Sequence, residues 1–169
     1  MTVTTIDKDT EALTLTLTAD FAAPVDAVWE LWADPRKLER WWGPPSYPAT
    51  FVEHDLTPGA LVTYFMTSPE GDKHYGWWRI GTVDAPRGLT MEDGFGDADG
   101  KPLTDKTGQL RMRLFEHEGG TRMELFDQFP SLEQMEEMLK MGMEEGLRQA
   151  VGQMDALLYQ PDEIRSQTG

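Results

Sequence analysis

The feature that most constrains the fold is a tryptophan-rich segment at residues 21–45, FAAPVDAVWELWADPRKLERWWGPP, which carries four of the six tryptophans of the chain. In its first half, apolar residues recur at the spacing of one helix face: Val25, Val28, Trp29 and Trp32. Pro24 suits the first turn of such a helix, because proline lacks the N–H group that would stay unpaired there. The segment therefore predicts a helix over residues 24–33 with one buried side.

A second short helix is predicted over residues 35–42. Asp34 followed by Pro35 is typical of an N-cap and a first helical residue. Trp41 and Trp42 contribute to the apolar side of this helix, and the Gly-Pro-Pro sequence that follows ends it. We expect the two helices to form one unit that closes one end of an internal cavity, with Trp41 and Trp42 near the entrance.

Seven runs of residues are predicted to be β-strands. Residues 13–19 alternate apolar and polar side chains, which places one face of the strand in the core. Six further runs end at turns rich in glycine or proline: 49–56, 60–67, 74–84, 89–95, 107–118 and 121–129. Together these runs predict a mostly antiparallel sheet with one solvated face.

The end of the chain predicts one long helix. Ser131 followed by Gln134 is the pattern of a capping box, and apolar residues then recur at helical spacing for about 28 residues. This helix must cover the apolar face of the sheet, because such a face needs a second layer. Gly142 and Gly146 lie on one side of the helix with Ala150. They indicate either a close approach to the sheet or space left for a ligand.

The order of these elements predicts an α+β, helix-grip fold. It would have a curved antiparallel sheet of about seven strands around a long C-terminal helix, with two short helices after the first strand. A chain of 169 residues is normally one domain. We expect a single domain with a core at about residues 12–158 and flexible ends at residues 1–10 and 161–169.

Composition narrows the class of partner. The formal net charge of −15 argues against nucleic acid, whose phosphates demand a basic surface. No apolar run approaches the roughly 18 residues needed to span a bilayer, and the N-terminus has no signal-peptide core. Without cysteine there is no disulfide and no thiolate site. We predict a cytoplasmic protein without membrane insertion.

Three segments together resemble the START-like (SRPBCC) superfamily: PVDAVWELWADPRKLERWWGP, HYGWWRIGTVDAPRGLTMEDGFGDADG and FPSLEQMEEMLKMGMEEGLRQAVGQMDALL. Within it they resemble the branch named for the activator of the heat-shock protein ATPase, over about residues 12–158. The resemblance implies a helix-grip (START/Bet v-like) fold with a hydrophobic cavity. The superfamily includes ligand carriers, cyclases, toxin-sequestering resistance proteins and co-chaperone domains. It often has tryptophan after the glycine of its last helix, where this chain has Leu147.

Asp93 is the candidate catalytic residue. If Leu89 and Met91 face the cavity, strand alternation puts Asp93 and Phe95 on the same face. A carboxyl group in apolar surroundings has a raised pKa, which suits a general acid or base. The alternative is that Asp93 lies at the mouth of the sheet, hydrated or paired with an arginine.

No metal site and no cofactor are predicted. His54, His74 and His117 lie in different predicted strands without the spacing of metal ligands. The acidic stretch after Asp93 lacks the register of an EF-hand and is predicted to be a polar hairpin loop. Arg111 is predicted to point outward with Arg113, because the apolar residues between and around them take the other face.

The predicted ligand-binding residues are aromatic and methionine side chains, since methionine adapts to irregular apolar shapes. Adjacent Trp77 and Trp78 must point to opposite faces of their strand, one lining the cavity and the other exposed or at an interface. The full set is Trp41, Trp42, Tyr64, Trp77, Trp78, Met91, Phe95, Met112, Met135, Met138, Met143 and Gly146.

The leading functional hypothesis is binding of a small hydrophobic molecule, of aromatic, lipid or polyketide-like type, without chemistry. One alternative is a cyclase or dehydratase that uses Asp93 as acid or base. Another is an interaction domain that modulates a chaperone ATPase. A homodimer and a chaperone both stay open as partners.

Overall fold

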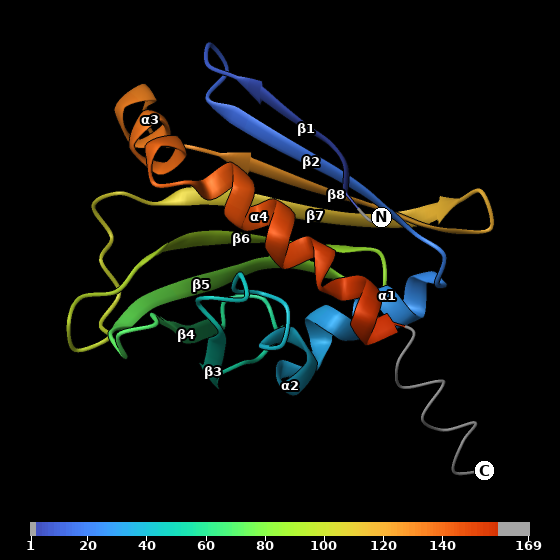
Figure 1. Ribbon diagram of the computed structural model, residues 1–169, viewed down its shortest axis with the longest axis horizontal. Coiled ribbons are helices and arrows are strands. Elements are labelled where there is room, and N and C mark those ends of the chain that lie inside the picture. The colour runs from blue at the N-terminus through green and yellow to red at the C-terminus, as the bar shows by residue number, and fades with distance from the viewer. Residues whose placement is uncertain (1–2, 159–169) are drawn as a thin grey trace.

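The computed structural model describes residues 3–158 of the chain. Its body is one curved antiparallel sheet with the strand order β1-β2-β8-β7-β6-β5-β4-β3 (Figure 1). The eight strands are β1 (Val3–Asp9), β2 (Thr14–Phe21), β3 (Ala49–Glu53), β4 (Leu61–Thr67), β5 (Lys73–Asp84), β6 (Gly88–Phe95), β7 (Gly108–His117) and β8 (Gly120–Gln128). The predicted helix-grip sheet is therefore confirmed, with one strand more than expected.

The additional strand is β1. Residues 1–10 are predicted to be flexible, but Val3–Asp9 pairs antiparallel with β2, from Val3 opposite Ala19 to Asp9 opposite Thr14. The segment lacks the alternation that marks the other strands, and the half-buried Ile6 is its apolar contact with the core. β1 forms because it pairs with the free edge of β2, a tertiary contact that local pattern does not report. The predicted flexible tail at residues 161–169 lies outside the described residues.

Two short helices follow β2 as predicted. They are α1 (Val25–Ala33) and α2 (Pro35–Leu38), and α2 ends four residues before the predicted boundary. The Asp34 side chain accepts a hydrogen bond of 2.9 Å from the Arg36 amide, which confirms the predicted N-cap. The fully buried Trp41 donates from its indole to the Leu31 backbone oxygen at 2.8 Å. The segment after α2 is thereby tied to α1.

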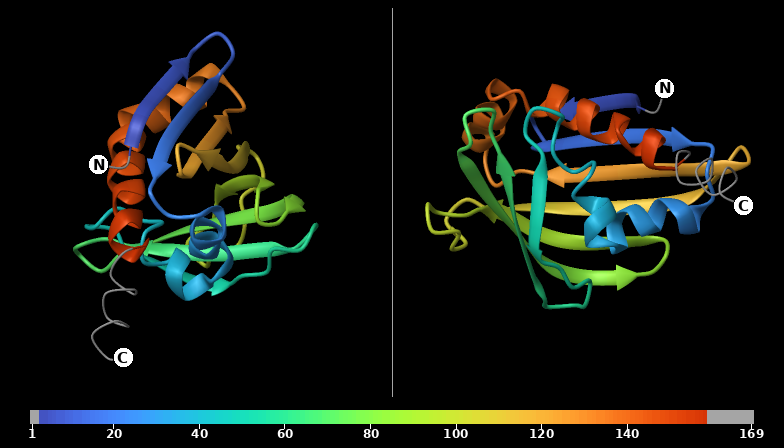
Figure 2. Two further views of the ribbon diagram at one scale, coloured as in Figure 1. Left: turned by 90° about the vertical axis from the view of Figure 1, so that its right-hand side faces the viewer. Right: turned by 60° about the horizontal axis from the view of Figure 1, so that its bottom comes forward.

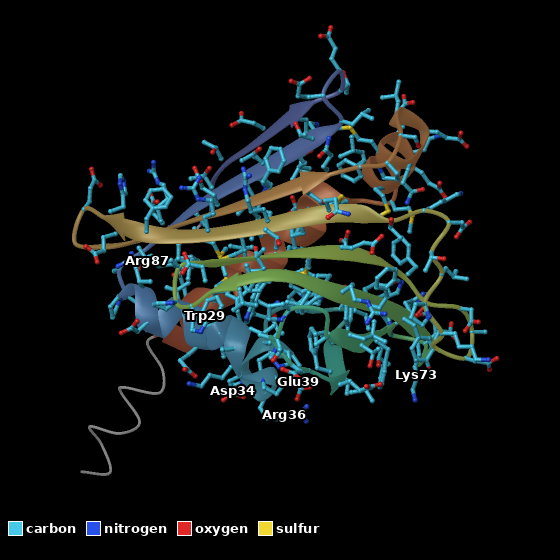
Figure 3. All side chains as sticks on the ribbon, turned by 180° about the vertical axis from the view of Figure 1, so that it is seen from behind. Trp29, Asp34, Arg36, Glu39, Lys73 and Arg87 are labelled. Atoms are coloured by element: carbon cyan, nitrogen blue, oxygen red, sulfur yellow. The ribbon has the colours of Figure 1, made fainter. Side chains whose placement is uncertain are left out.

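Side chains of α2 and its C-cap attach it to the edge strand β3. Arg36 Nη2 donates to the backbone oxygen of Phe51 at 2.9 Å, and Glu39 accepts from the Phe51 amide at 3.0 Å. Figure 3 labels Arg36 and Glu39 beside this edge of the molecule. These contacts supply partners for backbone groups that an edge strand would otherwise leave to solvent.

The predicted single long helix is wrong. The chain forms α3 (Leu132–Lys140) and α4 (Met143–Gly152), followed by a turn at Gln153 and a last helical stretch at 154–158. Gly142 has φ of 89°, a left-handed conformation that interrupts the helix and that glycine adopts without steric cost. The N-cap of α3 is confirmed, since Ser131 accepts from the Gln134 amide at 3.1 Å.

α4 runs diagonally across the concave face of the sheet, while α3 turns away at one end (Figures 1 and 2). Val151 and Met154 belong to the main apolar cluster beneath this helix, together with Trp32, Trp41 and Trp78. A second, smaller cluster lies toward α3 and consists of Leu15, Phe129 and Met135. Ile6 and Leu147 pack against both clusters. No helix in the described range is long and apolar enough to cross a bilayer.

Candidate ligand-binding site

Two aspartates project from the inner, otherwise apolar face of the sheet. Asp93 lies on β6 and Asp127 on β8, with β7 between these strands. Both approach Gly108 of β7: the position of a β-carbon on Gly108 would lie 2.9 Å from Asp93 Oδ1 and 3.7 Å from Asp127 Oδ1. The missing side chain of Gly108 therefore provides the space in which the two carboxyl groups come together.

The surroundings of this pair favour protonation. Burial raises the pKa of Asp93 to about 6, and the charge of Glu92 adds to the rise, while the backbone amides of Asp93 and Gly108 oppose it. Burial also raises the pKa of Asp127 well above its usual range, and the charge of Asp93 acts in the same direction. Two neighbouring buried carboxyl groups cannot both ionise freely, so the pair retains a proton to higher pH than isolated aspartates do.

Tyr64 of β4 brings a hydroxyl group to the same region. Its ring lies over Gly76 of β5, where an added β-carbon would sit 2.5 Å from the Tyr64 hydroxyl oxygen. Burial raises the pKa of Tyr64 to about 12, and the charges of Asp93 and Asp127 contribute to this rise. The hydroxyl group and the two carboxyl groups are thus electrostatic neighbours.

Indole groups complete the site. Trp78 of β5 lies opposite Asp93 in the β5–β6 register, and its ring centroid is 4.9 Å from that of Trp42 and 5.8 Å from that of Tyr64. Among the described residues, three buried indole N–H groups have no hydrogen-bond acceptor: those of Trp32, Trp42 and Trp78. The Trp42 and Trp78 N–H groups lie near enough to the Tyr64 hydroxyl to oppose the rise in its pKa, but neither reaches hydrogen-bond geometry.

The placement of Asp93 agrees with the first of the two predicted environments. Leu89 and Met91 are buried on the inner face, and Asp93 shares that face. None of the ion pairs found among the described residues includes Asp93. Pairing with an arginine, the alternative environment, therefore does not occur in this structure. Phe95 lies at the end of β6 with 45% of its surface exposed, so it does not share the buried setting of Asp93.

The structure places the adjacent residues Trp77 and Trp78 on opposite faces of the sheet. Trp78 is fully buried on the inner face. Trp77 lies on the opposite face, where its indole donates to the backbone oxygens of Phe95 at 3.0 Å and Leu103 at 3.3 Å. With only 3% of its surface accessible, Trp77 is covered by the loop between β6 and β7. It is neither on the interior face nor exposed, because that loop folds back over the convex side.

The remaining predicted ligand-binding residues fall into a fully buried group and a partly accessible group. Trp41, Met91, Met112 and Met135 are core residues with almost no accessible surface. The partly accessible ones are Trp42, Tyr64, Met138, Met143 and Gly146. A β-carbon on Gly142 or Gly146 would meet nothing within 4 Å, so close packing against the sheet does not explain either glycine. Arg111 and Arg113 are exposed, as predicted.

A separate hollow of about 540 Å³ opens on the surface, at the start of α1 and beside the β7–β8 turn. Pro24, Arg87, His117 and Gly119 are among the residues that line it. None of the predicted site residues contributes to it. Because this hollow is open and lined by charged side chains, it lacks the apolar walls expected of a hydrophobic ligand site.

Three site residues are missing from the sequence-based set, namely Asp127, Gly76 and Gly108. Asp127 carries a readable signal, because Met123 and Leu125 precede it at alternate positions on the same strand. Gly76 and Gly108 carry no such signal in the sequence. Their importance depends on which side chain of a neighbouring strand lies over them.

A curved antiparallel sheet that holds a C-terminal helix on its concave face defines the helix-grip class of the SRPBCC superfamily. The chain belongs to the family of Activator of Hsp90 ATPase homolog 1-like proteins, whose model matches residues 22–159. Among curated proteins, no match to the chain was found.

Solved structures of similar proteins agree with this assignment. Protein Ms6760 from Mycobacterium smegmatis is 49% identical, with a TM-score of 0.85 over 92% of this chain and 96% of that one. A protein from Arthrobacter aurescens is 47% identical, with a TM-score of 0.89 over 94% of this chain and 93% of that one. The AHSA1 protein from Silicibacter pomeroyi, at 22% identity and a TM-score of 0.68 over 86% and 96%, shares the fold.

Proposed function

We propose that the chain binds a small hydrophobic molecule between the sheet and α4, with Asp93, Asp127 and Tyr64 as its polar anchor. The observation that carries this proposal is the presence of unpaired polar groups on an otherwise apolar face. Asp127 is 9% exposed, and no hydrogen bond to its carboxyl group is found among the described residues. The buried indoles of Trp78, opposite Asp93, and of Trp42 lack acceptors. Each such group costs about 1–3 kcal/mol, so a face that served stability alone would carry apolar residues instead.

Partly accessible apolar side chains around this anchor support the same proposal. Trp42, Met66 and Leu147 pack against the main cluster without being closed off, and Met143 packs against the smaller one. Open space beside Gly146 adds room on α4. Soft methionine and flat aromatic surfaces suit an aromatic, lipid or polyketide-like molecule of irregular outline.

The test is a titration of lipids, flavonoids and polyketides, followed by tryptophan fluorescence and by amide and indole chemical shifts. Saturable shifts are expected at Gly108, Gly146 and the indoles of Trp42 and Trp78. Asp127→Leu should alter the affinity, whereas Arg113→Ala, on the exposed face of β7, should leave it unchanged. The absence of saturable shifts across the whole panel would contradict the proposal.

A second candidate function is acid–base catalysis of the cyclase or dehydratase kind. It is favoured by one observation, the neighbouring placement of two carboxyl groups whose pKa values are both raised. Such a pair supplies an ionised base beside a protonated acid. Asp93→Asn should then abolish turnover of a bound compound while its binding survives. Unchanged turnover in this variant would exclude the role.

A further inference from the structure

The unpaired groups of the anchor are of two opposite kinds. Asp127 offers acceptor oxygens for which the described residues supply no donor. Trp78 and Trp42 offer N–H donors for which the described residues supply no acceptor. A ligand that satisfied only one kind would leave the other buried and unpaired, at the cost of a lost hydrogen bond.

Geometry brings the two kinds together. Trp78 faces Asp93 across the β5–β6 pair, and the missing side chain of Gly108 lets Asp93 and Asp127 approach the same point from either side. The Tyr64 ring contacts the rings of Trp42 and Trp78, at centroid distances of 6.1 and 5.8 Å, and the charges of Asp93 and Asp127 contribute to the raised pKa of its hydroxyl. A single small polar group of a ligand can therefore face acceptors on one side and donors on the other.

We propose that this site recognises its ligand through a neutral hydroxyl group, which donates to the Asp93–Asp127 pair and accepts from the Trp78 and Trp42 indoles. The inference rests on the proposed function and specifies the chemistry of its ligand. A hydroxyl group both donates and accepts, which matches the two kinds of unpaired group.

Other groups on a ligand would satisfy fewer of the unpaired donors and acceptors of the site than a hydroxyl group does. A protonated amine only donates and leaves the indoles unpaired. A carboxylate only accepts and adds a negative charge beside two aspartates that have no basic partner among the described residues. A hydrocarbon leaves both kinds unpaired. At neutral pH Asp93 is largely ionised, since its pKa is about 6, and hydrogen bonds to an ionised acceptor are the stronger ones.

The test uses four probes of one shape: naphthylethanol, ethylnaphthalene, naphthylethylamine and naphthylacetate. Their dissociation constants are measured on the full chain by chemical-shift titration, with the indole N–H resonances of Trp42 and Trp78 followed separately. The alcohol should bind about tenfold more tightly than the hydrocarbon, as expected for one satisfied hydrogen-bonding group, and more tightly than the amine or the acetate. Both indole resonances should move downfield with the alcohol and remain in place with the hydrocarbon.

Asp127→Leu should reduce the ratio between alcohol and hydrocarbon to about one, while Arg113→Ala should leave it unchanged. The ratio in the unmodified protein is informative even if Asp127→Leu does not fold. Equal or tighter binding of the hydrocarbon or the amine would overturn the hydroxyl inference and leave the proposed function standing. Absence of saturable binding by all four probes would overturn the inference, and the wider panel would then decide the proposed function.

Discussion

Gln153 donates a hydrogen bond of 2.7 Å from its side-chain nitrogen to the backbone oxygen of Gly43. The same nitrogen lies 3.3 Å from the Trp41 backbone oxygen. Gln153 follows the last residue of α4, so one side chain joins the covering helix to the segment after α2. This contact connects the C-terminal end of α4 to the end of the molecule at which the tryptophan-rich helices α1 and α2 lie.

Removing the Gln153 side chain should weaken the attachment of α4 to the segment after α2. We expect Gln153→Ala to lower the free energy of unfolding by about 1–2 kcal/mol, because two backbone oxygens lose their donor. Chemical denaturation measures this change, and amide exchange near Trp41 should become faster. Gln149→Ala, an exposed position on the same helix, should change stability by less than about 0.5 kcal/mol. Equal effects of the two substitutions would contradict the role of Gln153.

The pKa of Asp93 predicts how stability depends on pH. Because this pKa rises from 3.8 to about 6 on folding, the folded state binds more protons than the unfolded chain between these values. The stabilising contribution of the protonated group is complete below the unfolded value and is lost as pH rises through about 6. Asp93→Asn should therefore raise the free energy of unfolding above neutral pH by roughly 1–3 kcal/mol. Urea unfolding across this pH range measures the effect.

Asp20 provides a control of opposite sign. A side-chain hydrogen bond from Arg122 lowers the pKa of Asp20, so its contribution is present above the ordinary aspartate value and is lost in acid. Asp20→Asn should destabilise the protein at neutral pH and reduce its sensitivity to acid. If both asparagine variants shifted stability in the same direction at neutral pH, the assignment for Asp93 would be wrong.

Two glycines near the start of α4 should respond oppositely to alanine. Gly146 has open space at the β-carbon position and a helical backbone, so Gly146→Ala should stabilise the protein by about 1 kcal/mol. Gly142 has φ of 89°, which alanine adopts at a cost of about 1–2 kcal/mol. Thermal unfolding of both variants tests this difference. A loss of stability in Gly146→Ala would show that the space beside it is needed for packing.

Gly76 should be intolerant of a side chain because of the Tyr64 ring above it. A β-carbon there would lie 2.5 Å from both the hydroxyl oxygen and Cζ of Tyr64. Gly76→Ala should displace the ring and destabilise the protein by about 1–3 kcal/mol. In a double-mutant cycle, Tyr64→Leu should recover part of this loss. Additive effects of the two substitutions would exclude a steric conflict between them.

Local sequence signals predicted most elements of the fold. The alternation of Leu15 and Leu17 in β2, the cap at Asp34 and the cap at Ser131 all appear where expected. The break at Gly142 was not predicted, because the apolar spacing continues through it. Spacing records which residues share a face, but not whether the backbone turns between them.

For the site, strand alternation correctly placed Asp93 on the inner face, and the same rule applies to Asp127. Parity left open which of Trp77 and Trp78 faces inward, since either choice satisfies the alternation. Two tertiary contacts show that Trp78 faces inward. The loop between β6 and β7 covers Trp77 on the outer face, and the β5–β6 register places Trp78 opposite Asp93. Such contacts join residues far apart in the chain, so no local pattern encodes them.

The sequence by itself determined the antiparallel strands, the two tryptophan-rich helices and the helical cover, because these depend on capping, turns and periodicity among neighbouring residues. Only the tertiary structure decided that Asp93 and Asp127 meet around Gly108. That meeting requires β6, β7 and β8 to lie side by side in one register. Its electrostatic consequence, a raised pKa of both carboxyl groups, follows from their burial, and for Asp127 also from the neighbouring charge of Asp93.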